Sequence, residues 1–196
     1  MNIAIIGNGN VGSGLARGLK RAGHEVRAVG KNGAAIRDTA ASAELVILAV
    51  PFGAIDDVVK AAGGAFAGKT IVDATNALDA NMNLAVGFTT SGAEDLQKKL
   101  PKSRVVKAFN TVFAQHMESG RLADQRLTAF VASDDESARK QVVELARSIG
   151  FDPVDSGPLK NARLLEPLAY FNIQLGYGLG MGTQIGFKLL HGRVNS

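Results

Sequence analysis

A glycine-rich loop near the start of the chain constrains its fold more than any other feature. Residues 3–6 form a short apolar run, residues 7–12 read GNGNVG, and Val11, Leu15 and Leu19 then recur every four residues. A change from a continuous apolar run to this helical spacing predicts a strand, a tight turn and a helix. In such a turn the first glycine permits the bend, the second lets a ligand approach the backbone, and the third allows close helix packing.

The pattern that follows extends this unit into a layered domain. Apolar runs alternate with helix-periodic segments as far as about residue 155, which predicts a mainly parallel sheet with helices on both faces. The expected strands are residues 3–6, 25–29, 45–50, 70–73, 104–109 and 127–132, and later helices are expected within 31–44, 54–62, 94–100, 133–150 and 161–175. We therefore expect a Rossmann-type, doubly wound α/β domain over residues 1–157 and a small C-terminal helical segment over residues 158–196.

The clearest helical pattern lies between Ser133 and Gly150. Ser133 and Glu136 have the spacing of a capping box, and Gly150 suits the helix end. The stripe expected to face the core consists of Ala138, Val142, Leu145 and Ile149. This helix should therefore cover one face of the sheet.

The C-terminal segment can be interpreted in two ways. Its helix, 161–175, contains Pro167 as a predicted kink. Glycines then occupy positions 176, 178, 180 and 182, alternating with Leu175, Tyr177, Leu179 and Met181. The pattern is compatible with a closely packed helix or with a loop against a ligand, and its apolar residues with a dimer face or with the core of a monomer.

The glycine loop is also a predicted dinucleotide site. A G-x-G-x-x-G match alone is weak, but here it follows a strand and opens a helix, which is the confirming context. The free backbone N–H groups of Asn10, Val11 and Gly12 would face the pyrophosphate at the helix N-terminus. We therefore expect the pyrophosphate to bind on this loop.

The end of the second strand indicates which dinucleotide binds. An NAD site places an acidic residue there to hold the ribose hydroxyls, whereas this chain has Gly30 and Lys31, and its nearest acid, Glu25, lies at the start of the strand. A lysine attracts a 2′-phosphate that a carboxylate would repel. NADP(H) is therefore the predicted cofactor, with Lys31 as the main phosphate contact and Arg37 as a second candidate.

Polar and aromatic residues follow three other predicted strands. Val50, Pro51 and Phe52 end the third strand, Asn76 follows the fourth, and Asn110 and Thr111 follow the fifth. Ligands of open α/β sheets bind beyond the carboxyl ends of the strands. The complete set of predicted cofactor-binding residues is Gly7, Asn8, Gly9, Asn10, Val11, Gly12, Gly30, Lys31, Val50, Pro51, Phe52, Asn76, Asn110 and Thr111.

The sequence contains no assignable acid–base pair, so no catalytic side chain is predicted. Asp73 and Lys107 fall within or at the ends of buried strands, where a structural role is the better interpretation. Hydride transfer between two redox cofactors needs mainly the alignment of two rings, because the cofactors carry the reactivity. Reduction of a carbonyl usually needs a proton donor as well.

Composition narrows the classes of partner and of site. The chain has no cysteine, three scattered histidines without metal-ligand spacing, and a formal net charge of +4. We expect no metal site, an anionic small-molecule ligand in preference to nucleic acid, and no membrane partner, because no run of about 18 apolar residues is present. With no basic N-terminal leader segment, a cytoplasmic location is expected.

Several longer segments carry a resemblance to a known family. The chain resembles the NADPH-dependent reductases of the deazaflavin coenzyme F420 and is similar to the reductase domain of the STEAP ferric reductases. The matching segments are IAIIGNGNVGSGLARGL, GHEVRAVGK, LAVPF, DATNAL and KAFNTV, followed by DSGPLKNARLLEPL and GMGTQIGFKLL in the most specific part, the tail.

The resemblance implies an enzyme that works as a homodimer. It implies hydride transfer between the nicotinamide and a flavin-like ring, with Gly30 and Lys31 in place of the family's serine and arginine at the 2′-phosphate. It also implies that Asn110 replaces a histidine of the F420-using archaeal enzymes. The acceptor therefore stays open between F420 and a flavin. The alternatives are a reductase of a small carbonyl or imine and a non-catalytic NADP(H) sensor.

Overall fold

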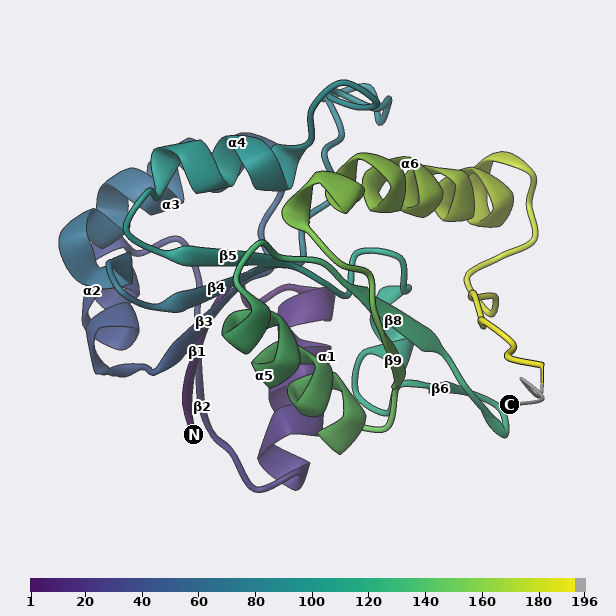
Figure 1. Ribbon diagram of the computed structural model, residues 1–196, viewed down its shortest axis with the longest axis horizontal. Helices are drawn as coiled ribbons and strands as arrows, with labels where there is room; N and C mark the ends of the chain where they lie inside the picture. Colours follow the sequence, from purple (N-terminus) through teal and green to yellow (C-terminus); the bar gives the residue numbers. More distant parts are fainter. Residues whose placement is uncertain (193–196) are drawn as a thin grey trace.

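A five-stranded parallel sheet forms the centre of the protein (Figure 1). The computed structural model describes residues 1–192. The strand order is β2-β1-β3-β4-β5. The bounds are β1 (Asn2–Ile6), β2 (Glu25–Val29), β3 (Leu45–Leu48), β4 (Thr70–Asp73) and β5 (Arg104–Lys107). The expected parallel sheet is confirmed, with its topological switch between β1 and β3.

Helices cover both faces of this sheet, as the doubly wound interpretation predicts. One face carries α1 (Asn10–Arg21) and α5 (Glu136–Ser148), and the other carries α2 (Gly33–Ser42), α3 (Ile55–Ala62) and α4 (Gly92–Lys99). Alternate residues of one strand enter the two cores: Ile3 and Ile5 pack with α1, whereas Ala4 and Ile6 pack with α2 and α3. Burial on both faces explains the continuous apolar runs of the central strands.

A second strand pair extends the sheet beyond β5. Strand β8 (Thr128–Val131) pairs in parallel with β9 (Asp152–Asp155). It reaches β5 through antiparallel hydrogen bonds between Lys107 and Ala132, with N–O distances of 2.8 and 3.0 Å. The sequence did not indicate β9, because its segment DPVD has no apolar run and contains a proline. A short hairpin, β6 (Arg121–Leu122) with β7 (Gln125–Arg126), was also missed.

Helix α5 has the predicted core stripe but a different N-terminus. Ala138 and its stripe partners are buried. Asp135 caps the helix, accepting a hydrogen bond from Ala138 N at 2.7 Å. The Ser133 hydroxyl instead donates to the carbonyl of Val105 at 2.7 Å, and Glu136 pairs with Lys140. The predicted capping box is therefore wrong, because Ser133 is recruited to hold the helix start against β5.

The glycines of the C-terminal segment fall partly within a helical turn and partly in a loop, and the contact of that loop with a ligand stays a prediction. Helix α6 (Ala162–Ile173), which contains Pro167, continues into a π-helical turn, Gln174–Gly178. Beyond it the chain is a loop in which Gly180 and Gly182 have φ of +72° and +74°. Within residues 1–192, no helix is both long enough and apolar enough to cross a bilayer.

Candidate nucleotide-binding site

The three glycines of the loop between β1 and α1 occupy different environments. Gly7 has φ of +116°, and a Cβ there would lie 2.1 Å from the carbonyl oxygen of Ala49. A Cβ on Gly12 would lie 1.9 Å from the carbonyl oxygen of Gly7. Gly9 has no atom within 4 Å of its Cβ position. The outer glycines are thus required by the fold, while the middle glycine leaves open space above the backbone.

The N-terminus of α1 faces this open space. Gly9 is the N-cap residue, no side chain caps the helix, and its first turn contains no acidic residue. The nearby Ser13 hydroxyl donates to the carbonyl of Asn8 at 3.0 Å instead of accepting from the first turn. The first amides of a helix have no partner within it. Those of Asn10, Val11 and Gly12 therefore remain available to an anion, and their contact with a pyrophosphate stays a prediction.

Two hollows meet at the loop, on either side of it. The first has a volume of about 400 Å³ and is lined by Gly7, Asn8, Gly9, Gly30, Lys31, Val50 and Pro51, among others. The second has a volume of about 440 Å³ and is lined by Gly9, Asn10, Val11, Val50, Pro51, Phe52 and Asn76, among others. They share Gly9 and the segment after β3. Together they form a groove at the switch between β1 and β3, where open α/β sheets bind ligands.

The first hollow contains the residues expected to select the dinucleotide. A Cβ on Gly30 would lie 3.3 Å from the side-chain atoms of Asn8, so glycine gives this asparagine its room. Lys31 lines the hollow from the end of β2, whereas Arg37 does not line it. Asp57 of α3, which was not among the predicted residues, lines the opposite wall. One ammonium and one carboxylate thus border the hollow.

Only some of the residues predicted to bind the cofactor after the third, fourth and fifth predicted strands line the second hollow. Phe52 and Asn76 line it, and the Oδ1 atom of Asn76 is buried without a hydrogen-bond partner. Asn110 and Thr111 do not line it. Asn110 donates through Nδ2 to the carbonyl of Leu165 at 2.9 Å, and Thr111 accepts at its carbonyl from Asn172 Nδ2 at 3.2 Å. Both therefore fasten α6 to the segment after β5.

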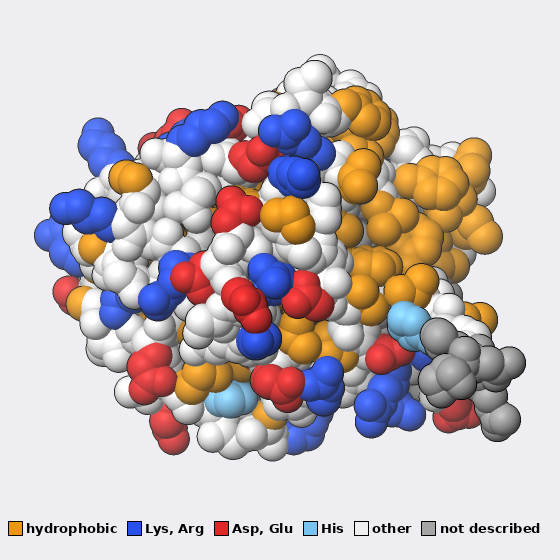
Figure 2. Space-filling view, viewed as in Figure 1, with side chains coloured by type: hydrophobic (Ala, Val, Ile, Leu, Met, Phe, Trp, Pro, Cys, Tyr) orange, Lys and Arg blue, Asp and Glu red, His pale blue; other side chains and the backbone are white. Residues whose placement is uncertain are grey.

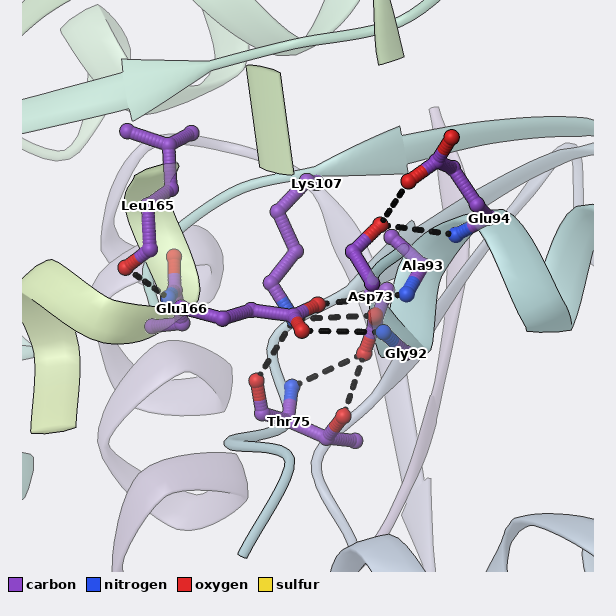
Figure 3. Close-up of polar contacts among 10 residues, drawn as sticks. Asp73, Thr75, Gly92, Ala93, Glu94, Lys107, Leu165 and Glu166 are labelled. Atoms are coloured by element: carbon purple, nitrogen blue, oxygen red, sulfur yellow. Dashed lines mark hydrogen bonds and ion pairs between the residues drawn. The ribbon is translucent and has the colours of Figure 1, made fainter. Parts of the chain in front are cut away.

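Behind the second hollow lies a group of fully buried charged residues (Figure 3). The ammonium of Lys107 lies 3.0 Å from a carboxylate oxygen of Asp73 and 3.0 Å from one of Glu166. Burial alone would lower the pKa of Lys107, but attraction to the two carboxylates outweighs it and raises that pKa above its usual value. We call Asp73, Lys107 and Glu166 the buried ionic cluster.

The sequence indicated only two members of this cluster. Asp73 and Lys107 were expected to be structural, but Glu166 of α6 was missed. Its signal was an acidic residue on the same helical face as Ala162, Leu165 and Ala169, all of them buried. An acid within such a stripe needs a buried partner. Among residues 1–192, no group of histidine and acidic side chains is arranged to hold a metal ion.

Comparison with known proteins identifies the family. The profile of the family described as NADP oxidoreductase coenzyme F420-dependent matches residues 2–77. The F420-dependent NADP reductase of Methanothermobacter thermautotrophicus is 31% identical, over 89% of this chain and 89% of the relative. The chain belongs to the F420-dependent NADP oxidoreductase family. The expected family resemblance and the expectation of an NADP-dependent oxidoreductase are thus confirmed at the level of the family.

Two solved structures illustrate how similar this member of the F420-dependent NADP oxidoreductase family is to other proteins in its fold. A crystal structure from Arthrobacter sp. FB24, provisionally assigned as an F420-dependent NADP reductase, has a TM-score of 0.89 at 30% identity and covers 97% of this chain and 100% of its own. A reductive aminase from Aspergillus terreus has a TM-score of 0.67 at 18% identity over 91% of this chain and 62% of its own. The second likeness shows the fold alone.

The similarity to STEAP proteins covers less of both chains. Human metalloreductase STEAP2 is 36% identical over 111 residues, which are 56% of this chain and 21% of the relative. The chain thus spans about a fifth of the length of the STEAP relatives that it matches. The shared part is limited to one segment of those longer proteins.

Proposed function

We propose that this member of the F420-dependent oxidoreductase family binds NADP(H) along the groove and transfers a hydride between the nicotinamide and a deazaflavin or flavin ring. One observation carries the proposal: two hollows meet at Gly9, directly in front of the uncapped N-terminus of α1. The pyrophosphate would lie on the first-turn amides, the 2′-phosphate beside Lys31, and the nicotinamide beside Phe52 and Asn76.

The phosphate side of the groove supports NADP(H). At the end of β2, the position of an NAD-selecting carboxylate is taken by Gly30 and Lys31, and the next polar side chain, Asn32, caps α2 by accepting from Ala35 N at 3.0 Å. A carboxylate-free strand end with an exposed ammonium favours a third phosphate. The Asp57 carboxylate on the opposite wall limits that preference.

The second hollow supports an acceptor with its own redox chemistry. Asp79 is the one ionisable side chain among its lining residues. Its carboxylate accepts from the backbone N–H groups of Asn81 and Asn83 at 2.8 and 2.9 Å, and so shapes the loop. Apolar and aromatic groups such as Phe52 and Leu78 fill much of the remaining wall. This lining suits the alignment of flat rings better than proton donation to a carbonyl or imine.

Acceptor-dependent oxidation of NADPH tests the proposal. The protein is mixed with NADPH and with F420, FMN or FAD in turn, and the near-ultraviolet absorbance of reduced nicotinamide is followed. Turnover with one of these acceptors supports hydride transfer to a flavin-like ring. Oxidation only with a small ketone or imine would identify the alternative reductase. NADPH binding without oxidation by any acceptor would indicate a sensor.

The proposal includes a homodimer and a cytoplasmic location, where the NADPH pool is available. Figure 2 shows a broad apolar area on the side of α6 and the following tail. Exposed apolar residues of these segments include Leu164, Phe171, Tyr177, Leu179, Met181 and Leu190. Contiguous apolar surface of this kind marks interaction sites on otherwise polar proteins. A second copy of this chain is the proposed occupant, through a two-fold interface.

A further inference from the structure

The two carboxylates of the buried ionic cluster act only as hydrogen-bond acceptors. Asp73 accepts from the backbone N–H of Thr75 at 2.9 Å and from its hydroxyl at 2.7 Å. Glu166 accepts from Gly92 N at 2.9 Å and from Ala93 N at 3.2 Å. Both also face the ammonium of Lys107 (Figure 3). Acceptor-only surroundings are those of ionised carboxylates.

The cluster therefore carries an excess of negative charge in the interior. Two carboxylates oppose one ammonium, which leaves one negative charge, and the side chains of Asp73, Lys107 and Glu166 are 2%, 0% and 0% exposed. Helix α4 compensates part of this charge, because its positive N-terminal end supplies the Gly92 and Ala93 amides to Glu166. Water cannot screen the remainder, as it would on the surface.

A single residue, Thr75, lies between this charge and the second hollow. Lys107 donates to the carbonyl of Thr75 at 2.7 Å, and Asp73 holds the N–H of the same residue. Thr75 lines the second hollow together with Asn76. The charged side chains thus lie directly behind the wall at which the nicotinamide is proposed to bind.

We infer that the buried ionic cluster tunes the hydride-donating power of the bound nucleotide. This inference rests on the proposed function. The oxidised nicotinamide ring carries a positive charge that the reduced ring lacks. A net negative charge behind the wall stabilises NADP⁺ more than NADPH, and so makes the bound couple a stronger hydride donor. Asp73 and Glu166 exert this effect through their charge. Thr75 is uncharged and only forms the wall between the buried ionic cluster and the nicotinamide.

The expected size follows from Coulomb's law in a protein interior. A unit charge acting over about 10 Å, partly compensated by a helix terminus, changes the ratio of the two affinities about 3- to 10-fold. We therefore expect removal of one negative charge to raise the ratio of Kd for NADP⁺ to Kd for NADPH by about 3- to 10-fold.

The ratio of the two Kd values is measured by calorimetric titration of the full chain with each nucleotide, in the wild type and in two variants. Glu166→Gln removes a charge at the α4 contact, and Asp73→Asn removes one at the Thr75 contact. Because the two variants disturb different hydrogen bonds, either one that keeps the wild-type circular dichroism spectrum decides the question. Glu25→Gln is the matched control: it removes an exposed charge at the opposite end of the sheet and should leave the ratio unchanged.

The outcomes separate this inference from the proposed function. A raised ratio in a folded variant supports electrostatic tuning. Equal weakening of NADP⁺ and NADPH binding, with the ratio unchanged, shows that the cluster only holds the wall and overturns the inference. Failure of the wild-type chain to bind either nucleotide would defeat the proposed function itself.

Discussion

The carbonyl oxygen of Gly7 lies 1.9 Å from the position of a Cβ on Gly12. This oxygen has little freedom to move, because the Gly7 N–H is bound to the carbonyl of Val29 at 2.8 Å and the residue packs against Ala49. A Cβ on Gly9, which lies between them, would have no atom of another segment within 4 Å. Folding and ligand access therefore depend on different glycines of one loop, and substitution can separate the two.

We predict that Gly9→Val folds but does not bind NADPH. A valine at this N-cap position costs about 1 kcal/mol of unfolding free energy, and its side chain would occupy the space in front of the α1 amides. Gly12→Val should cost about 3 kcal/mol or more, because its side chain overlaps the loop backbone. Chemical denaturation and calorimetric NADPH titration check both variants. Retained affinity in Gly9→Val would show that the nucleotide lies elsewhere.

Lys31→Asp should reverse part of the preference for NADPH over NADH. A charge-assisted hydrogen bond to the 2′-phosphate contributes about 1.5–3 kcal/mol, which is about a 10- to 100-fold change in Kd. Binding of NADH, which lacks this phosphate, should change little. Lys102→Asp is the control, since this exposed lysine precedes β5 at the other end of the sheet. Equal preference in wild type and Lys31→Asp would remove Lys31 from phosphate recognition.

Much of the fold follows from short-range pattern in the sequence. The runs 3–6, 45–50 and 70–73 are apolar because both faces of a central parallel strand are buried. The spacing of Val142 and Leu145 identified α5 because one helical face meets the core. The groove residues that directly follow strands in the sequence were also predictable, because the carboxyl ends of parallel strands lie at the same edge of the sheet.

Features that depend on contacts between distant segments were not predictable. The Ser133 hydroxyl bonds to Val105 across the sheet, and this overrides the local capping pattern. Asn110 follows a strand as expected, yet Leu165 of α6 provides its partner. Glu166 joins a cluster whose other members lie far away in sequence. The positions of these side chains are set by hydrogen bonds between distant segments. A rule based on local residue spacing cannot predict such bonds.

Placing a charge among the exposed apolar residues should dissociate the proposed dimer into single chains. Leu179 is 72% exposed, and Leu179→Glu places a charge within the apolar area without touching the groove. We expect the dimeric mass of the wild type to fall to that of one chain in size-exclusion chromatography with light scattering. Ala41→Glu, on the exposed side of α2, is the control. A monomeric wild type would contradict the homodimer, as would a Leu179→Glu variant that stays dimeric.

The ion pair between Glu94 and Arg163 should give the stability of the protein a component that depends on pH. Arg163 donates to both carboxylate oxygens, at 2.8 and 2.7 Å, and links α4 to α6. The hydrogen bond from Arg163 is the main cause that lowers the pKa of Glu94 below its usual value of 4.5. A carboxyl with a lowered pKa in the folded state stabilises the protein above its unfolded-state pKa, and this contribution is lost as the pH falls through the folded-state pKa.

Comparing unfolding free energies between about pH 6 and about pH 3 isolates this contribution. The wild type should lose stability below the usual pKa of Glu94 more steeply than Arg163→Met, in which the carboxyl has lost its partner. Arg147→Met is the matched control, because Arg147 pairs with the exposed Glu144 within α5 and should leave the wild-type slope intact. Parallel curves for the wild type and Arg163→Met would show that solvent exposure of the guanidinium cancels the effect. The α4–α6 contact would then depend on the hydrogen bonds that Glu166 accepts from Gly92 and Ala93 and on apolar packing such as that of Ala93 with Ala162.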